Sequence, residues 1–91
     1  MRQIDSKFHI ESDSIIKTSN GEVIPEEEPV FLLRARDYLA LRLLQKYRRM
    51  CVSDGCTDYQ LSGVDASIER FSDFTLKFNA RMKQPGITRG L

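Results

Sequence analysis

Arginine and lysine are the residues whose type and spacing could do chemistry in this sequence. Arg34 and Arg36 alternate with apolar residues, and the positions that follow add further cations. A guanidinium group donates paired hydrogen bonds to phosphate or carboxylate, so several converging arginines would form an anion site. The candidate ligand-binding residues are Arg34, Arg36, Arg42, Lys46, Arg49, Arg70, Lys77 and Arg81.

A second interpretation of these cations stays open. Long basic side chains can simply solvate two amphipathic helices and pair with nearby acids, such as residues 26–28 or Asp73. DNA or RNA binding is less favoured, because the net charge is only +1 and neither a helix-turn-helix spacing nor an aromatic RNA-binding signature is present. The sequence therefore predicts either a local anion site or a solvated surface.

Other reactive side chains are few. His9 stands alone beside Phe8 and Ile10, and we expect it on the solvent side of a strand rather than in a catalytic site. Cys51 is expected in the core and Cys56 as an exposed thiol, and their C-x4-C spacing is weak support for a redox pair. One histidine and two cysteines do not make a structural zinc site. We expect no enzyme activity, no metal and no cofactor.

The positioning elements begin with strands. Residues 7–11 alternate between apolar and polar, and residues 14–19 are β-branched and end at Asn20-Gly21, a strong hairpin signal. Residues 22–24 should return as a third strand, before an acidic connection that completes residues 1–29. Residues 30–36 should form a fourth strand, with Arg34 and Arg36 on one face.

Two helices should follow. The first is predicted over residues 37–52, with Asp37 as its N-cap and an apolar arc of about 140°. The second is predicted over residues 62–83, with Ser62 and Asp65 in a capping arrangement, and residues 84–91 should be a tail. The fold class is α+β: a small antiparallel sheet of three to four strands followed by a two-helix hairpin packed on one face.

Composition indicates one small domain over residues 1–91. Residues 1–29 carry seven acids against three bases, a net of −4, and residues 30–91 carry eleven bases against six acids, a net of +5. Such a split can steer an anionic partner or draw copies together, and we expect a homo-oligomer. The longest uncharged apolar run, residues 30–33, is too short for a membrane span. With no apolar leader, we expect a soluble cytoplasmic protein with reduced thiols.

The segment Ile24-Pro-Glu-Glu-Glu-Pro-Val-Phe-Leu-Leu-Arg-Ala-Arg-Asp37, followed by an amphipathic helix, resembles a motif of small phage and prophage accessory proteins. It covers about a sixth of the chain. The resemblance implies an accessory protein in a bacterial host cytoplasm, of the kind that inhibits a protein or sequesters a ligand.

The leading hypothesis is therefore a non-catalytic protein that holds an anionic ligand, such as a nucleotide, through its arginine cluster. The alternative is an inhibitor or adaptor that binds a host protein through an exposed helix face. Leu41 and Tyr59 are the candidate anchors for that alternative.

Overall fold

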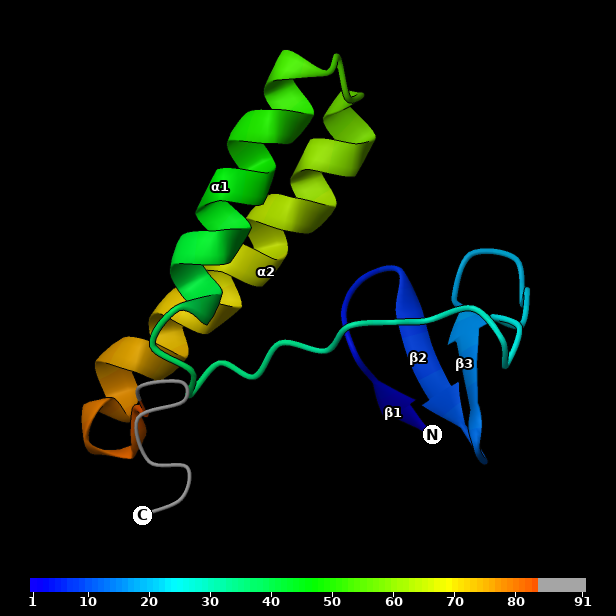
Figure 1. Cartoon of the computed structure of the whole chain (residues 1–91), viewed down its shortest axis with the longest axis horizontal. Coiled ribbons are helices and arrows are strands. Elements are labelled where there is room, and N and C mark those ends of the chain that lie inside the picture. The colour runs from blue at the N-terminus through cyan, green and yellow to red at the C-terminus, as the bar shows by residue number, and fades with distance from the viewer. Residues whose placement is uncertain (84–91) are drawn as a thin grey trace. The chain divides into compact units, whose positions relative to one another are not determined.

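The structure, a computed structural model, describes residues 1–83 (Figure 1). The chain divides into two compact units, Met1–Phe31 and Leu32–Leu91. The first holds an antiparallel sheet and the second holds two helices that pack together, which confirms the α+β class. Packing of the helices on a face of the sheet, and one domain for the whole chain, stay predictions. The predicted tail, residues 84–91, lies outside the described residues.

The sheet has three strands in the order β1-β2-β3, and their bounds are Arg2–Gln3, Phe8–Glu11 and Ser14–Lys17. Strand β2 is central and pairs antiparallel with both neighbours. The predicted turn after β3 is present, because Gly21 has a φ of 75° and its amide donates to the Lys17 carbonyl over 2.8 Å. The strands predicted within residues 7–11 and 14–19 are confirmed as β2 and β3. Strand β1 was not predicted from the sequence.

The strand predicted at residues 22–24 is reduced to one bridge. Val23 pairs with Ile16, and the Ile24 amide donates to the Ile15 carbonyl over 2.9 Å. Pro25 follows directly and has no amide to donate, so the ladder cannot continue. The prediction of a full third strand at these residues was wrong.

His9 is buried, with 8% of its surface exposed, and the prediction of a solvent-facing imidazole was wrong. Its Nδ1 lies 2.9 Å from the Thr18 hydroxyl and its Nε2 lies 3.1 Å from the Glu11 carboxylate. A polar ring can be buried when both nitrogens have hydrogen-bonding partners. The alternation of residues 7–11 could not reveal this, because Thr18 belongs to the turn after β3.

Residues 30–36 form no strand, so the prediction of a fourth strand was wrong. Val30, Phe31 and Leu32 are exposed, Phe31 by 84%. The Asp37 amide donates to the Arg34 carbonyl over 3.0 Å in a local turn, and the Lys83 amide donates to the Arg36 carbonyl over 2.6 Å in an isolated parallel bridge between Asp37 and Lys83. Apolar, β-prone residues form a strand only where a neighbour supplies ladder partners.

Helix α1 spans Ala40–Ser53 and begins three residues later than predicted. Leu39 occupies the N-cap position, while the Asp37 carboxylate accepts a 2.8 Å hydrogen bond from the Leu39 amide in the preceding turn. Asp37 therefore binds a nearby amide without being the N-cap. The predicted end at residue 52 is confirmed to within one residue, and Gly55 follows the helix with a φ of 80°.

Helix α2 spans Asp58–Lys77, so both of its predicted ends were wrong. Thr57 is the N-cap, and its hydroxyl accepts a 3.2 Å hydrogen bond from the Gln60 backbone amide. In return, the Thr57 backbone amide donates to the Gln60 side-chain oxygen over 2.9 Å. This capping box starts the helix before Ser62. After Lys77 a 3-10 turn, η1, spans Asn79–Arg81. It leads to Lys83, whose carbonyl accepts from the Tyr38 amide over 2.7 Å.

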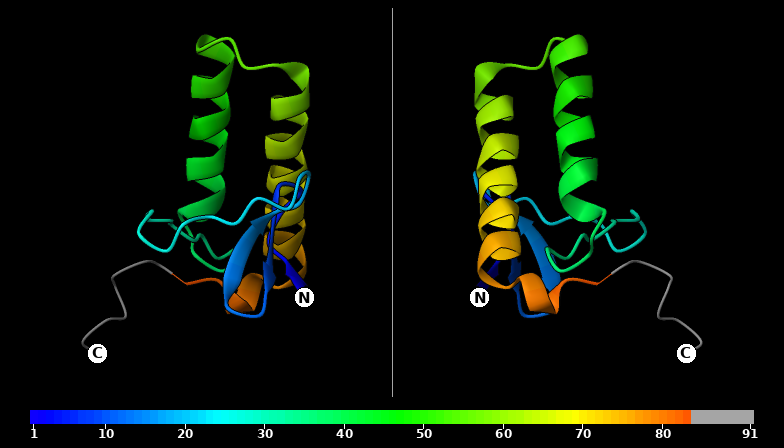
Figure 2. Two further views of the ribbon diagram at one scale, coloured as in Figure 1. Left: turned by 90° about the vertical axis from the view of Figure 1, so that its right-hand side faces the viewer. Right: turned by 90° about the vertical axis from the view of Figure 1, so that its left-hand side faces the viewer.

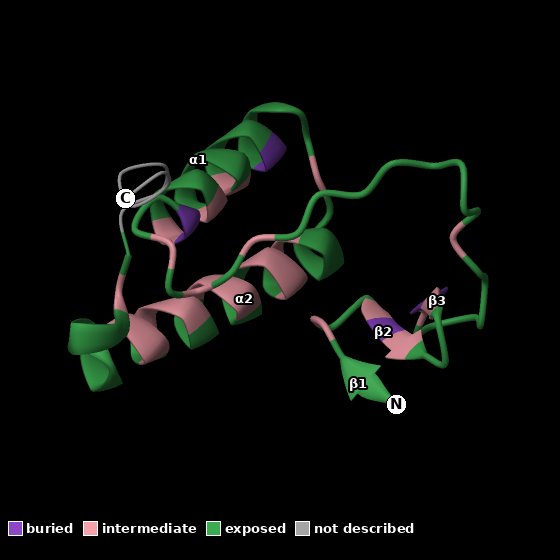
Figure 3. Cartoon of the chain, turned by 60° about the horizontal axis from the view of Figure 1, so that its bottom comes forward, coloured by how far each residue is buried: buried purple, intermediate pink, exposed green. Residues whose placement is uncertain are grey.

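The two helices run side by side, joined by the short turn of residues 54–57 (Figure 2). In α1, Ala40 and Cys51 are buried, while α2 has no fully buried residue (Figure 3). The apolar residues of α2 are half-buried: Val64, Ile68, Phe71 and Phe74. Within residues 1–83, no helix combines the length and apolar composition that crossing a bilayer requires.

Candidate anion-binding surface on the first helix

Three exposed cations, Arg42, Lys46 and Arg49, lie on one side of α1 and are here called the basic stripe. Their spacings of four and three residues place neighbours on adjacent turns of the same face. At 1.5 Å of rise per residue, the three Cα positions extend over about 10 Å along the helix. Residues 40–53 contain no Asp or Glu, so α1 supplies no carboxylate that would neutralise the stripe.

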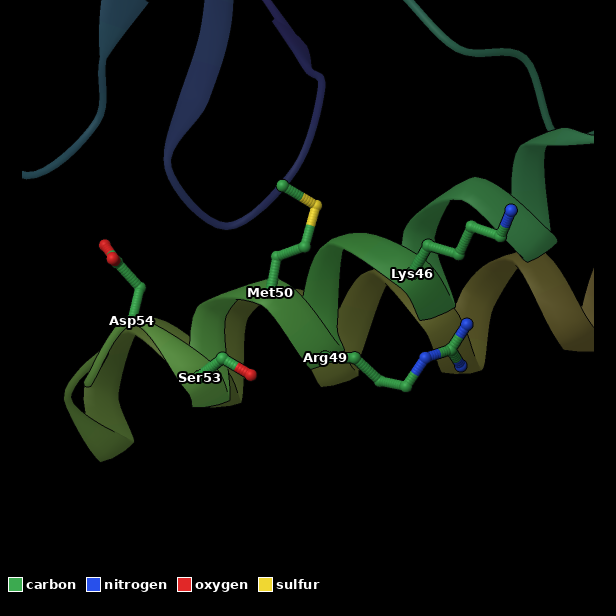
Figure 4. Close-up of a pocket in the computed structure, with 5 residues that line it drawn as sticks. All are labelled: Lys46, Arg49, Met50, Ser53 and Asp54. Atoms are coloured by element: carbon green, nitrogen blue, oxygen red, sulfur yellow. The ribbon is translucent and has the colours of Figure 1, made fainter.

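A depression of about 530 Å³ adjoins the stripe (Figure 4). Lys46, Arg49, Met50, Ser53 and Asp54 line it. In the close-up, the Lys46 and Arg49 side chains extend in the same direction along α1, and Asp54 lies at the opposite end. The depression therefore has a cationic end, an apolar wall at Met50 and an acidic end.

The dipole of α1 adds to the difference in electrostatic potential between the cationic and the acidic end of the depression. The carboxyl end of a helix carries partial negative charge, which opposes an anion within the last turn. Ser53 closes α1 and Asp54 follows it, so both lie where that field is negative. An anion is favoured towards Arg42 and Lys46, and the Ser53 end suits a hydrogen-bond donor of the ligand instead.

Arg34 and Arg36 lie in the segment before α1, which is neither strand nor helix, and both side chains are exposed. Because this segment is not a strand, the alternation that was to place them on one face of a sheet is absent. The Arg34 carbonyl accepts from the Asp37 amide in a turn, and the Arg36 carbonyl accepts from the Lys83 amide in the isolated bridge. Their part in an anion site stays a prediction.

The cations of the second helix have different surroundings. Arg70 and Lys77 are exposed on α2, and the exposed acid Asp73 lies three residues after Arg70 and four before Lys77, on the same side of the helix. The Arg81 guanidinium lies over the rings of Phe74 and Phe78, 5.3 Å and 5.0 Å from their centroids. Stacking of this kind stabilises the cation locally. The basic stripe is thus the one set of candidate residues that shares a helix face without a neighbouring acid on its own helix.

Arg48, which the sequence did not single out as a ligand residue, joins the two helices. Its Nε and Nη2 atoms donate to the two carboxylate oxygens of Asp65, over 2.5 Å and 3.4 Å. These contacts raise the pKa of Arg48 above its ordinary value, first through the hydrogen bond and then through the carboxylate charge. Arg48 therefore links the two helices, and its guanidinium group binds Asp65 instead of a ligand.

An exposed apolar row runs beside the basic stripe and was missed as a functional surface. Leu39, Leu43, Tyr47 and Met50 form this apolar stripe, and each is at least two-fifths exposed. All four lie within the apolar arc of about 140° that the sequence predicts for this helix, and such an arc is ordinarily expected to face the core. The two anchors proposed from the sequence are not part of the apolar stripe, because Leu41 is half-buried and Tyr59 is exposed on α2.

Across residues 1–83, no cluster of three or more His, Cys, Asp or Glu side chains could hold a metal ion. His9 is engaged by Thr18 and Glu11 within the sheet. The absence of enzyme activity stays a prediction.

The chain was also compared with known proteins. Searches of protein families, of curated proteins and of solved structures found no match.

Proposed function

We propose that this chain is a small non-catalytic binding protein that holds a phosphate-bearing ligand on the basic stripe. The observation that carries the proposal is the exposure of Arg42, Lys46 and Arg49 along one face of a helix that has no acid. Clustered exposed cations repel one another, and a bound anion relieves that repulsion. Guanidinium groups in addition supply paired donors that fit phosphate oxygens.

The shape of the site favours an extended anion. Arg42 and Lys46 are one turn apart, about 6 Å along the axis, and Arg49 follows after about 4.5 Å. This linear spacing suits a ligand with two or more linked phosphates, such as a nucleoside di- or triphosphate. Met50 offers an apolar surface beside Lys46 and Arg49 for the uncharged part of such a ligand. Sequestration of a nucleotide in a bacterial host cytoplasm is the biological role that we propose with it.

Calorimetry with ADP, ATP and inorganic pyrophosphate tests the proposal. Two double variants are compared, and each loses two positive charges. The helix variant combines Lys46→Ala with Arg49→Ala, and the sheet variant combines Arg2→Ala with Lys7→Ala. All four side chains are exposed, and the second pair lies in the sheet unit. Each charged hydrogen bond contributes about 1.5–3 kcal/mol, so the helix variant should bind at least tenfold more weakly. The sheet variant should bind as the unchanged chain does.

Absence of heat with all three ligands would contradict the proposal, as would equal weakening in both variants. Equal weakening would mean that net charge alone attracts the anion. Binding should also weaken as salt is raised, since the distance over which exposed charges attract shortens from about 30 Å at 0.01 M salt to about 10 Å at 0.1 M. Affinity that did not change with salt would contradict a site built from exposed cations.

A second candidate function is protein binding through the apolar stripe of α1. Four large apolar side chains in one exposed row are typical of a surface that another protein covers. Size-exclusion chromatography with light scattering would detect a second copy, and crosslinking at high salt would detect a different partner. Leu43→Glu should abolish either association, and association unchanged by Leu43→Glu would contradict this candidate.

A further inference from the structure

The carboxyl end of α1 has a specific backbone geometry that involves both cysteines. The Cys56 amide donates to the Cys51 carbonyl over 2.9 Å, and the Gly55 amide donates to the Val52 carbonyl over 3.2 Å. Gly55 lies between them with a φ of 80°. These two bonds around a left-handed residue define a Schellman motif, in which Cys51 and Cys56 take the two positions whose side chains usually touch.

The hydrogen bond between the two cysteines limits how far apart they are. Bond lengths along the path from carbonyl to amide hold the two Cα atoms within about 7 Å, and the bend at the carbonyl carbon shortens this further. Disulfides usually join Cα atoms about 4.4 to 6.8 Å apart. The backbone therefore limits the separation of the pair to about the largest value that a disulfide usually bridges.

The pKa of Tyr47 is affected by both cysteines. Tyr47 lies one turn before Cys51, and a hydrogen bond with the Cys51 side chain is the main cause that raises the pKa of Tyr47. The electrostatic effect of Cys51 and burial add to the increase, and Cys56 contributes in the same direction. The two cysteines therefore both affect the electrostatics of one phenol.

We propose that Cys51 and Cys56 form a dithiol that oxidises reversibly to an intramolecular disulfide, with a low-molecular-weight disulfide such as glutathione disulfide as the oxidant. Cys51 is buried and Cys56 is half-buried, so the Cys56 thiolate is the group that meets the oxidant first. The C-x4-C spacing alone was weak support for a redox pair. The Schellman motif supplies the geometry that the spacing lacked.

The reaction balances in two exchange steps. The Cys56 thiolate attacks one sulfur of glutathione disulfide, which forms a mixed disulfide and releases one glutathione thiolate. The Cys51 thiolate then attacks the Cys56 sulfur, forms the Cys51–Cys56 bond and releases the second glutathione. The protein loses two electrons and two protons, and glutathione disulfide gains them as two thiols.

The test uses the full chain at low concentration in buffers of reduced and oxidised glutathione, followed by acid quenching and alkylation. Cleavage before Asp54, which lies between the cysteines in sequence, separates them onto two peptides. After incubation in oxidising buffer, mass spectrometry should detect the two peptides as one disulfide-linked species. Reduction should convert this species into the two separate peptides. Cys51→Ala and Cys56→Ala should each yield only a mixed disulfide with glutathione or an unmodified thiol.

Gly55→Ala tests whether the motif positions the pair. No atom lies within 4 Å of an added Cβ, so the change strains only the left-handed backbone. We expect the equilibrium yield of disulfide relative to dithiol to fall about fivefold. The proposal is overturned if the unchanged chain yields only glutathione adducts or links between chains, or if Gly55→Ala forms the disulfide as readily as the unchanged chain.

Discussion

The Arg48 guanidinium of α1 donates two hydrogen bonds to the Asp65 carboxylate of α2. This pair spans the hairpin and divides the cations of α1 into two groups. Arg48 faces the second helix, while Arg42, Lys46 and Arg49 lie on the exposed side. The proposed anion site therefore consists of the cations of α1 that the hairpin does not use.

Replacing Arg48 should affect stability only slightly. The pair is about two-fifths to one-half exposed, and ion pairs in that setting are screened by solvent. Arg48→Ala should lower the melting temperature less than Phe71→Ala, which removes a half-buried ring and should destabilise by about 1–3 kcal/mol. Thermal melts of both variants check this order, and an Arg48 variant as unstable as the Phe71 variant would contradict it.

Capping of α2 should depend on Thr57 rather than Ser62. Thr57→Ala removes the side-chain acceptor of the Gln60 amide and should lower stability by about 0.5–2 kcal/mol. Ser62→Ala is the matched control, because the Ser62 hydroxyl donates to the Tyr59 carbonyl inside the helix and caps nothing. Urea unfolding measures both, and equal losses would argue against the Thr57 cap.

His9 should be important for the sheet unit. His9→Ala removes a buried ring that bonds Thr18 and Glu11, and we expect a loss of about 1–3 kcal/mol. Hydrogen exchange of the β2 and β3 amides would report the loss within that unit. Unchanged protection of those amides would contradict a structural role for the imidazole.

Tyr47 should titrate above the ordinary tyrosine pKa of 10.0, mainly because its phenol bonds the Cys51 side chain. A raised folded-state pKa gives stability that is complete below pH 10 and is lost as pH rises through the folded pKa. The difference in phenolate absorbance between the unchanged chain and Tyr47→Phe isolates this group. In Cys51→Ala the midpoint should move towards 10.0, and an unmoved midpoint would contradict the stated cause.

Local signals in the sequence predicted the parts of the fold that depend on neighbouring residues. The turn at Asn20-Gly21 and the end of α1 at Gly55 follow from glycine at positive φ. The start of α2 could also have been predicted, because Thr57-Asp-Tyr-Gln60 matches a capping box, but Ser62 and Asp65 were chosen instead.

Features that depend on distant residues were not predictable in the same way. A β-prone segment such as residues 30–36 becomes a strand only if a partner strand is available, and its own composition does not specify one. The burial of His9 depends on Thr18, nine residues away. Arg42, Lys46 and Arg49 were named as candidates from the sequence, whereas their separation from Arg70 and Lys77 required the packing of α1 on α2.

The central claim is that a phosphate-bearing anion binds the exposed cations of α1, and the arginine Nε–Hε resonances test it most directly. Inorganic pyrophosphate is added to isotopically labelled protein, with Arg42→Lys and Arg49→Lys for assignment. We predict saturable shifts for Arg42 and Arg49, and little change for Arg48 beside Asp65 or Arg81 over its phenylalanine rings. Equal shifts at all arginines, or no saturable shift at Arg42 and Arg49, would contradict the account.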